Sequence, residues 1–83
     1  MNARHAATLA LVGWYLMLPP IGLGGLPNEE APLLKWHTIA SYDTAPQCHD
    51  FQEKAVGAEN DQKYKKMWQS GACIETADPR LAR

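Results

Sequence analysis

The chain has 83 residues, of which 46% are hydrophobic and 20% are charged, and its formal net charge at pH 7 is −1. It is too short for two ordinary domains and too apolar for a fully disordered chain. The sequence pI of about 6.2 argues against a nucleic-acid partner, because a nucleic-acid-binding protein of this size normally has a basic face and a high pI. We therefore expect one small core and no nucleic-acid binding.

The N-terminal segment carries almost no charge. Arg4 makes its start weakly positive, and the apolar run Ala6–Leu18 follows. A positive start followed by such a run is typical of an export signal, because the positive end stays on the cytoplasmic side while the apolar run enters the lipid. We therefore expect residues 1–27 to be a signal peptide or a membrane anchor that begins with a hydrophobic helix and contacts the membrane.

The fate of this segment is left open by its length and composition. As a helix, Ala6–Leu18 would span about 20 Å, short of the roughly 30 Å hydrocarbon core, and Pro19 and Pro20 interrupt a longer helix. These features favour a cleaved signal, but no A-x-A-like cleavage site follows. The longer stretch Ala6–Leu26 can span a membrane if it bends at the prolines. A retained anchor, a cleaved signal and a buried apolar segment of a soluble protein remain as alternatives.

The remainder of the chain divides into a linker, a small domain and a short end. Residues 28–33 are expected to be a linker, because the surrounding sequence is rich in glycine and proline. Residues 34–78 form the expected domain, which begins with a strand at about 35–42, where apolar and polar residues alternate. Residues 79–83 are expected to be a flexible C-terminus.

Helical signals follow the first expected strand. Residues 44–47, Thr-Ala-Pro-Gln, have the form of a capping box with proline in the first turn. Gly57 is either an interior residue of one helix that runs to about Ser70 or the end of a first helix, with Asn60 or Asp61 capping a second. A second short strand is expected at 72–76.

The two cysteines, Cys48 and Cys73, are expected to form a disulfide if the tail lies outside the cytoplasm. The bond closes a loop of about 26 residues and contributes about 3.5 kcal/mol by the chain-entropy estimate. It requires Cα atoms within about 7 Å, whereas an uninterrupted helix of about 26 residues would be about 39 Å long. A disulfide therefore predicts that the chain doubles back near Gly57–Asn60.

Catalytic, cofactor and metal sites receive little support from the residues. His37, Cys48, His49 and Cys73 make a poor zinc set, because adjacent Cys-His side chains diverge on a helix and no C-x-x-C pair exists. A thiol nucleophile at Cys48 lacks a third orienting group. We predict no catalytic, cofactor-binding or metal-ligating residues. The larger apolar side chains of the tail are expected in the core rather than in a ligand-binding box: Trp36, Phe51, Met67 and Trp68.

Several short motifs give the chain a resemblance to a known group. They are Trp14–Pro20, Ala31–Ala45 with Trp36 inside it, then Cys48, and the closing Cys73-Ile74 and Asp78-Pro79-Arg80-Leu81. The chain resembles a group of small uncharacterised bacterial proteins that have an N-terminal hydrophobic segment and a two-cysteine tail ending in D-P-R-L. The resemblance implies a bacterial, exported protein and assigns no site residues.

These observations predict a small α+β fold: a hydrophobic N-terminal helix, then strand–helix(es)–strand joined by Cys48–Cys73. The predicted function is that of a non-enzymatic envelope protein that acts through contacts with an unidentified protein partner. It would be anchored in the inner membrane with its tail outside the cytoplasm, or periplasmic or secreted if cleaved. The alternatives are a periplasmic module that binds a small ligand or metal near Trp36, Trp68 and His37, and a thiol-dependent enzyme.

Overall fold

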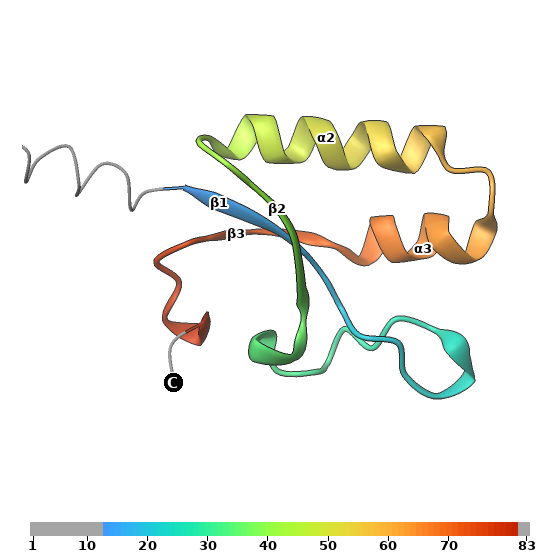
Figure 1. Cartoon of the computed structure of the whole chain (residues 1–83). Helices are drawn as coiled ribbons and strands as arrows, with labels where there is room; N and C mark the ends of the chain where they lie inside the picture. The colour runs from blue at the N-terminus through green and yellow to red at the C-terminus, as the bar shows by residue number, and fades with distance from the viewer. Residues whose placement is uncertain (1–12, 82–83) are drawn as a thin grey trace, which may run out of the picture.

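A computed structural model describes residues 13–81 of the chain and has a small α+β architecture, as the sequence predicts. Its sheet has three antiparallel strands, β1 (Trp14–Leu18), β2 (His37–Tyr42) and β3 (Ala72–Glu75), in the order β2-β1-β3. The first strand in the sequence is therefore the central strand of the sheet (Figure 1). The observed β2 and β3 confirm the two strands that the alternating and β-branched residues predicted.

β1 differs from the expected hydrophobic helix. Residues Trp14–Leu18 lie within the apolar run but form a strand, in which Leu16 is 0% exposed and Met17 3%. A central strand that is covered on both faces has a continuous apolar sequence, which resembles that of a buried helix. The expected helix over residues 6–12 lies outside the described residues.

The two faces of the sheet are covered by different parts of the chain. Residues directly opposite each other in an antiparallel pair share a face, so Leu16 shares one with its partner Cys73. The disulfide from Cys73 to Cys48 shows that this face lies against α2. On the other face, Met17 and Ile74 pack with the buried Leu33.

The helices α2 (Ala45–Ala58) and α3 (Gln62–Ser70) run antiparallel, side by side (Figure 1). The predicted capping box is present at the start of α2: Thr44 accepts a hydrogen bond from the backbone N–H of Gln47, whose side chain accepts one from the N–H of Thr44. α3 begins at the predicted cap Asp61, which accepts from the N–H of Lys63. The helical region is thus broken, as the disulfide requires.

The predicted disulfide joins Cys48 to Cys73, with their Cα atoms 6.1 Å apart. Cys48 is completely buried. A second link holds the helices together, because Nε2 of Gln52 on α2 donates to the carbonyl oxygens of Trp68 and Gly71 at 2.8 and 2.9 Å. These carbonyls belong to the end of α3, where the last carbonyl groups of a helix lack the full set of intrahelical donors; the carbonyl of Trp68 also accepts from the N–H of Gly71. The disulfide and Gln52 therefore fix α2 against both β3 and α3.

β2 contains an irregularity that breaks its predicted alternation. Leu16 lies opposite Ala40 and Met17 lies opposite Thr38, so Ile39 has no direct partner on β1. Such a bulge moves the residues on its two sides to opposite faces of the sheet. Thr38 and Ala40, which alternation puts on the same face, therefore lie on different faces, and the side chain of Ile39 is 45% exposed.

The segments outside the helices and strands are also ordered by contacts. In the expected linker, Leu33 is buried, and the indole N–H of Trp36 donates to the carbonyl of Ala31 at 2.9 Å. In the expected flexible end, Pro79–Leu81 forms a 3-10 turn, and Leu81 packs on the cluster around Met17. Both segments therefore contribute to the face of the sheet opposite α2.

Candidate functional site

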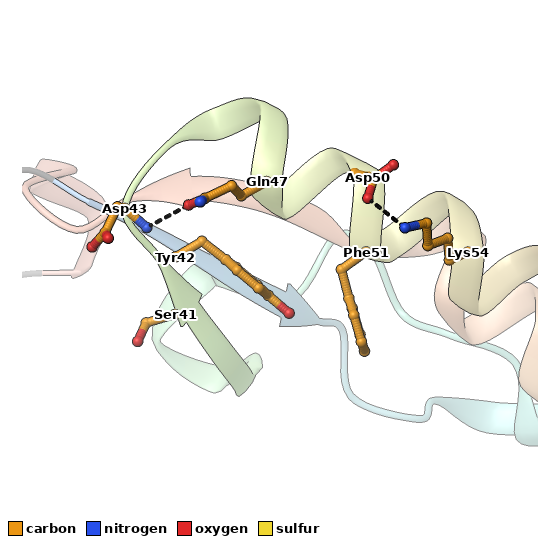
Figure 2. A pocket seen from close by; sticks show the side chains of 7 residues that line it. All are labelled: Ser41, Tyr42, Asp43, Gln47, Asp50, Phe51 and Lys54. Atoms are coloured by element: carbon orange, nitrogen blue, oxygen red, sulfur yellow. Dashed lines mark hydrogen bonds and ion pairs between the residues drawn. The ribbon is translucent and has the colours of Figure 1, made fainter.

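An open groove lies where β2 meets the start of α2 (Figure 2). Its volume is about 470 Å³. The tight connection from Tyr42 to Ala45 turns the chain from strand into helix, so that residues of both elements face one hollow. The side chains that line the groove are Ser41, Tyr42, Asp43, Gln47, Asp50, Phe51 and Lys54.

The capping box holds one end of this groove. Oε1 of Gln47 accepts from the backbone N–H groups of both Asp43 and Thr44 at 3.2 Å. Figure 2 shows the bond from Asp43. These bonds satisfy backbone donors at the helix start and fix the angle at which β2 enters α2. The same local sequence that begins the helix therefore also shapes the groove.

Aromatic side chains form the apolar part of the site. The ring centroids of Tyr42 and Phe51 lie 6.0 Å apart, and Phe51 makes an edge-to-face contact with Trp68 at 6.0 Å. Both distances fall within the range in which aromatic pairs attract each other. Phe51 remains 40% exposed, so the row of rings that connects β2, α2 and α3 presents an apolar surface to solvent.

Charged side chains surround these rings. Nζ of Lys54 forms an exposed ion pair with Asp50 at 3.0 Å, one helical turn apart (Figure 2). Asp43, at the end of the groove near the capping box, adds a second carboxylate. With two carboxylates and one ammonium group, the groove has an excess of negative charge, which favours an apolar segment that also carries a basic side chain.

The sequence-predicted residues fall into separate parts of the molecule. Cys48 and Cys73 are joined as expected. Trp36 packs against the cluster of Met17 on one face of the sheet, whereas Trp68 contacts Phe51 among the helices. Trp36 and Trp68 of the proposed ligand region, which also includes His37, therefore lie on different faces of the sheet.

The aromatic residues of the groove are only partly those expected in the core. Phe51 was expected in the core but is exposed, because its ring, which contacts Tyr42 and Trp68, also lines the open groove. One sequence signal could identify this groove. It consists of an aromatic residue at the end of a strand, then a capping box, then a second aromatic residue in the first turns of the helix.

Two further properties hold for the described part of the chain. Among residues 13–81, no group of three or more histidine, cysteine, aspartate or glutamate side chains is arranged to hold a metal ion. No helix within that range combines the length and the apolar character needed to cross a membrane.

Comparison with protein-family models, with curated proteins and with solved structures gave no match to this chain.

Proposed function

We propose that this protein is a non-enzymatic exported protein of the bacterial envelope that acts through contacts with another protein. The observation that carries the proposal is the Cys48–Cys73 bond, because disulfides persist in oxidising compartments and are rare in the cytoplasm. The bond is structural rather than reactive in this proposal, since Cys48 is fully buried and buried cysteines are generally inert.

Any cleavage during export must leave the three-stranded sheet intact. Removal of residues 1–27 would take away β1, the strand to which both β2 and β3 are paired. We therefore propose that the exported domain keeps Trp14–Leu18, and that any cleavage falls before Gly13. This position is N-terminal to residue 27, where the expected signal peptide or anchor ends.

The groove between β2 and α2 is the proposed contact surface. Its occupant is an extended segment of a partner protein, with an apolar side chain against Tyr42 and Phe51 and a basic side chain near Asp43. Exposed aromatic rings in a groove are the kind of side chain that contributes most to binding energy at protein interfaces. β2 lies at an edge of the sheet formed by the described residues, so backbone pairing of an extended segment is compatible with this position.

The exported state is tested by mass and thiol measurements on protein recovered from the envelope fraction of its native host. We expect an intact mass lower by the two hydrogens lost on disulfide formation, no alkylation of Cys48 before reduction, and an N-terminus at or before Gly13. Protein found in the cytosol with both thiols alkylatable would contradict the proposal.

The contact surface is tested by a photo-crosslinking amino acid placed at Lys54, inside the groove, or at Glu53, which is also exposed on α2 but does not line it. We expect a discrete protein adduct in living cells from position 54 and none from position 53. Phe51→Ser should abolish the adduct without changing the oxidation state of the cysteines. Equal adducts from both positions would rule out the groove as the contact surface.

A further inference from the structure

An apolar loop projects from the end of β1 on the side of the molecule near α3 (Figure 1). We call Ile21–Pro27 the leucine loop. Its three large aliphatic side chains are exposed: Leu23 by 99%, Leu26 by 56% and Ile21 by 49%. Single exposed apolar residues are common on proteins, but three within six positions of one projecting loop are an arrangement found at interaction sites.

The leucine loop is an ordered structure rather than a slack connection. The N–H of Gly22 donates to the carbonyl of Leu26 at 2.7 Å, and the N–H of Asn28 donates to that of Pro20 at 2.8 Å. A β-bridge between Ile21 and Pro27 closes the base. Because these bonds fix the backbone, the exposed side chains are held outward without a large entropy cost of ordering on binding.

Two glycines give the loop its tip. Gly24 and Gly25 have φ angles of 78° and 77°, in the region that side-chain-bearing residues rarely adopt. A Cβ atom at either position would meet nothing within 4 Å. The glycines are therefore needed for backbone conformation and not for space, and this conformation leaves Leu23 fully exposed.

Two lysines lie beside the leucine loop. Lys63 and Lys66 on α3 are exposed and line, together with Gly24, Gly25, Leu26 and Pro27, a hollow of about 340 Å³. Their spacing of three residues puts both ammonium groups on one face of α3. The structure therefore combines an ordered apolar tip with adjacent positive charge.

We propose that the leucine loop and Lys63 and Lys66 form a docking surface for an anionic lipid membrane. Leu23 and Leu26 enter the boundary between headgroups and acyl chains, and the lysines lie at the level of the lipid phosphates. This is the division of roles found in peripheral membrane-binding surfaces, where buried apolar area and attraction to anionic lipid add together. The surface is distinct from the β2–α2 groove and does not depend on the proposed partner protein.

Charge complementarity favours a lipid surface over an apolar protein partner. The lysines lie beside the apolar tip, and amphipathic lysine side chains commonly keep their charge at the polar boundary of a membrane. Glu29 and Glu30 follow the loop in the sequence and oppose the attraction. We therefore expect binding that is moderate in strength and that weakens as salt is raised, because added ions screen the lysine–phosphate attraction.

The test uses the full, oxidised chain and sedimentation with vesicles of phosphatidylcholine, either alone or mixed with phosphatidylglycerol. We expect the protein to sediment with the mixed vesicles and much less with the neutral ones. Leu23→Ser should weaken binding about tenfold or more, as expected from the apolar area that no longer enters the lipid. Leu34→Ser is the matched control, because Leu34 is 51% exposed but lies outside the loop.

The lysines are tested by the double variant Lys63→Gln/Lys66→Gln, with Lys35→Gln/Lys65→Gln as a control of equal charge, because neither Lys35 nor Lys65 lines the hollow beside the loop. The first should lose about tenfold in affinity at low salt, and the second should change little. Inorganic phosphate should not release the protein more than chloride does at equal ionic strength.

Three outcomes would overturn the membrane proposal. These are failure to sediment with mixed vesicles, equal losses in the test and control variants, and release by inorganic phosphate alone. The proposal would also be overturned if the loop variants lost binding to a protein but kept binding to vesicles, because the partner of the loop would then be a protein and not lipid. Unchanged thermal unfolding of Leu23→Ser, whose side chain is almost fully exposed, excludes misfolding as the cause of a loss.

Discussion

Leu16 lies directly opposite Cys73 in the β1–β3 ladder, and Cys73 is bonded to Cys48 on α2. Leu16 and Cys48 are both completely inaccessible to solvent. The disulfide is therefore situated next to the centre of the sheet and joins the helical layer to the strand that neighbours the central one. This arrangement makes the covalent bond and the packing of β1 parts of the same core.

Removal of the disulfide should lower stability strongly. The double variant Cys48→Ala/Cys73→Ala is expected to lose about 3.5 kcal/mol of unfolding free energy, because the unfolded chain is no longer constrained by the loop. Urea denaturation measures this loss. The unmodified protein in excess reductant should approach the stability of the double variant, whereas unchanged stability in reductant would show that the bond contributes little.

Leu16 tests whether the apolar run acts as a strand of the folded domain. Leu16→Ala should cost about 2–5 kcal/mol, because it leaves a cavity at a fully buried position. Leu23→Ala, in the same N-terminal part of the chain but 99% exposed, should change the unfolding free energy by less than about 0.5 kcal/mol. Equal effects in denaturation would be inconsistent with β1 as the central strand.

Gly71 and Gly57 should respond in opposite directions to substitution by alanine. At Gly71 a Cβ atom would lie 2.7 Å from Cδ2 of Leu18 and 3.1 Å from the carbonyl oxygen of Met17. Because Leu18 is buried, Gly71→Ala should destabilise the protein by about 1–3 kcal/mol.

At Gly57, an exposed position inside α2, a Cβ atom would meet nothing within 4 Å. Gly57→Ala should stabilise by about 0.5–1 kcal/mol, since alanine loses less backbone entropy in a helix. Thermal unfolding of both variants provides the comparison, and a shift of the same sign in both would contradict it.

Asp78 should titrate below the usual range of an aspartate. The Arg80 side chain donates to its carboxylate at 2.8 and 3.1 Å and the Arg80 backbone N–H at 2.8 Å, and these bonds lower the pKa of Asp78 from its ordinary value of 3.8. A carboxyl with a lowered folded-state pKa contributes stability above its unfolded pKa, and this contribution is lost as pH falls through the folded pKa.

The pKa is measured by NMR titration of the Asp78 carboxyl carbon. Arg80→Gln should raise the pKa of Asp78 toward its ordinary value, with only part of the shift remaining from the backbone hydrogen bond. Lys54→Gln, which removes the partner of Asp50 instead, should leave the Asp78 titration unchanged. The same pKa in the protein and in Arg80→Gln would show that the turn is not held by this pair.

The parts of the fold that the sequence predicted are those with strong local or covalent signals. The capping box at Thr44 and Gln47 specifies a helix start through its own side chains. The disulfide limits how far apart Cys48 and Cys73 can lie, and this excludes one long helix. In both cases a few neighbouring residues, or one bond, were enough to determine the structure.

β1 and the bulge in β2 were harder to predict because their structures depend on distant residues. The apolar run from Trp14 has no alternation, and only its pairing with Tyr42 and Glu75 shows that it is a strand. The bulge at Ile39 is likewise set by the register with β1. The groove could be predicted in part, since its capping box is local, but the approach of Phe51 to Trp68 depends on the packing of α2 against α3.

The order of the strands has a consequence for how the protein is made. β1 leaves the ribosome early, but its neighbour β3 is synthesised near the end of the chain. Pairings between such distant segments give a high contact order and slow folding. One side of β1 therefore remains unpaired while the intervening chain is translated. If the protein is exported as proposed, this delay keeps the nascent polypeptide unfolded while it is translocated, and we expect it to require chaperone protection when translocation is delayed.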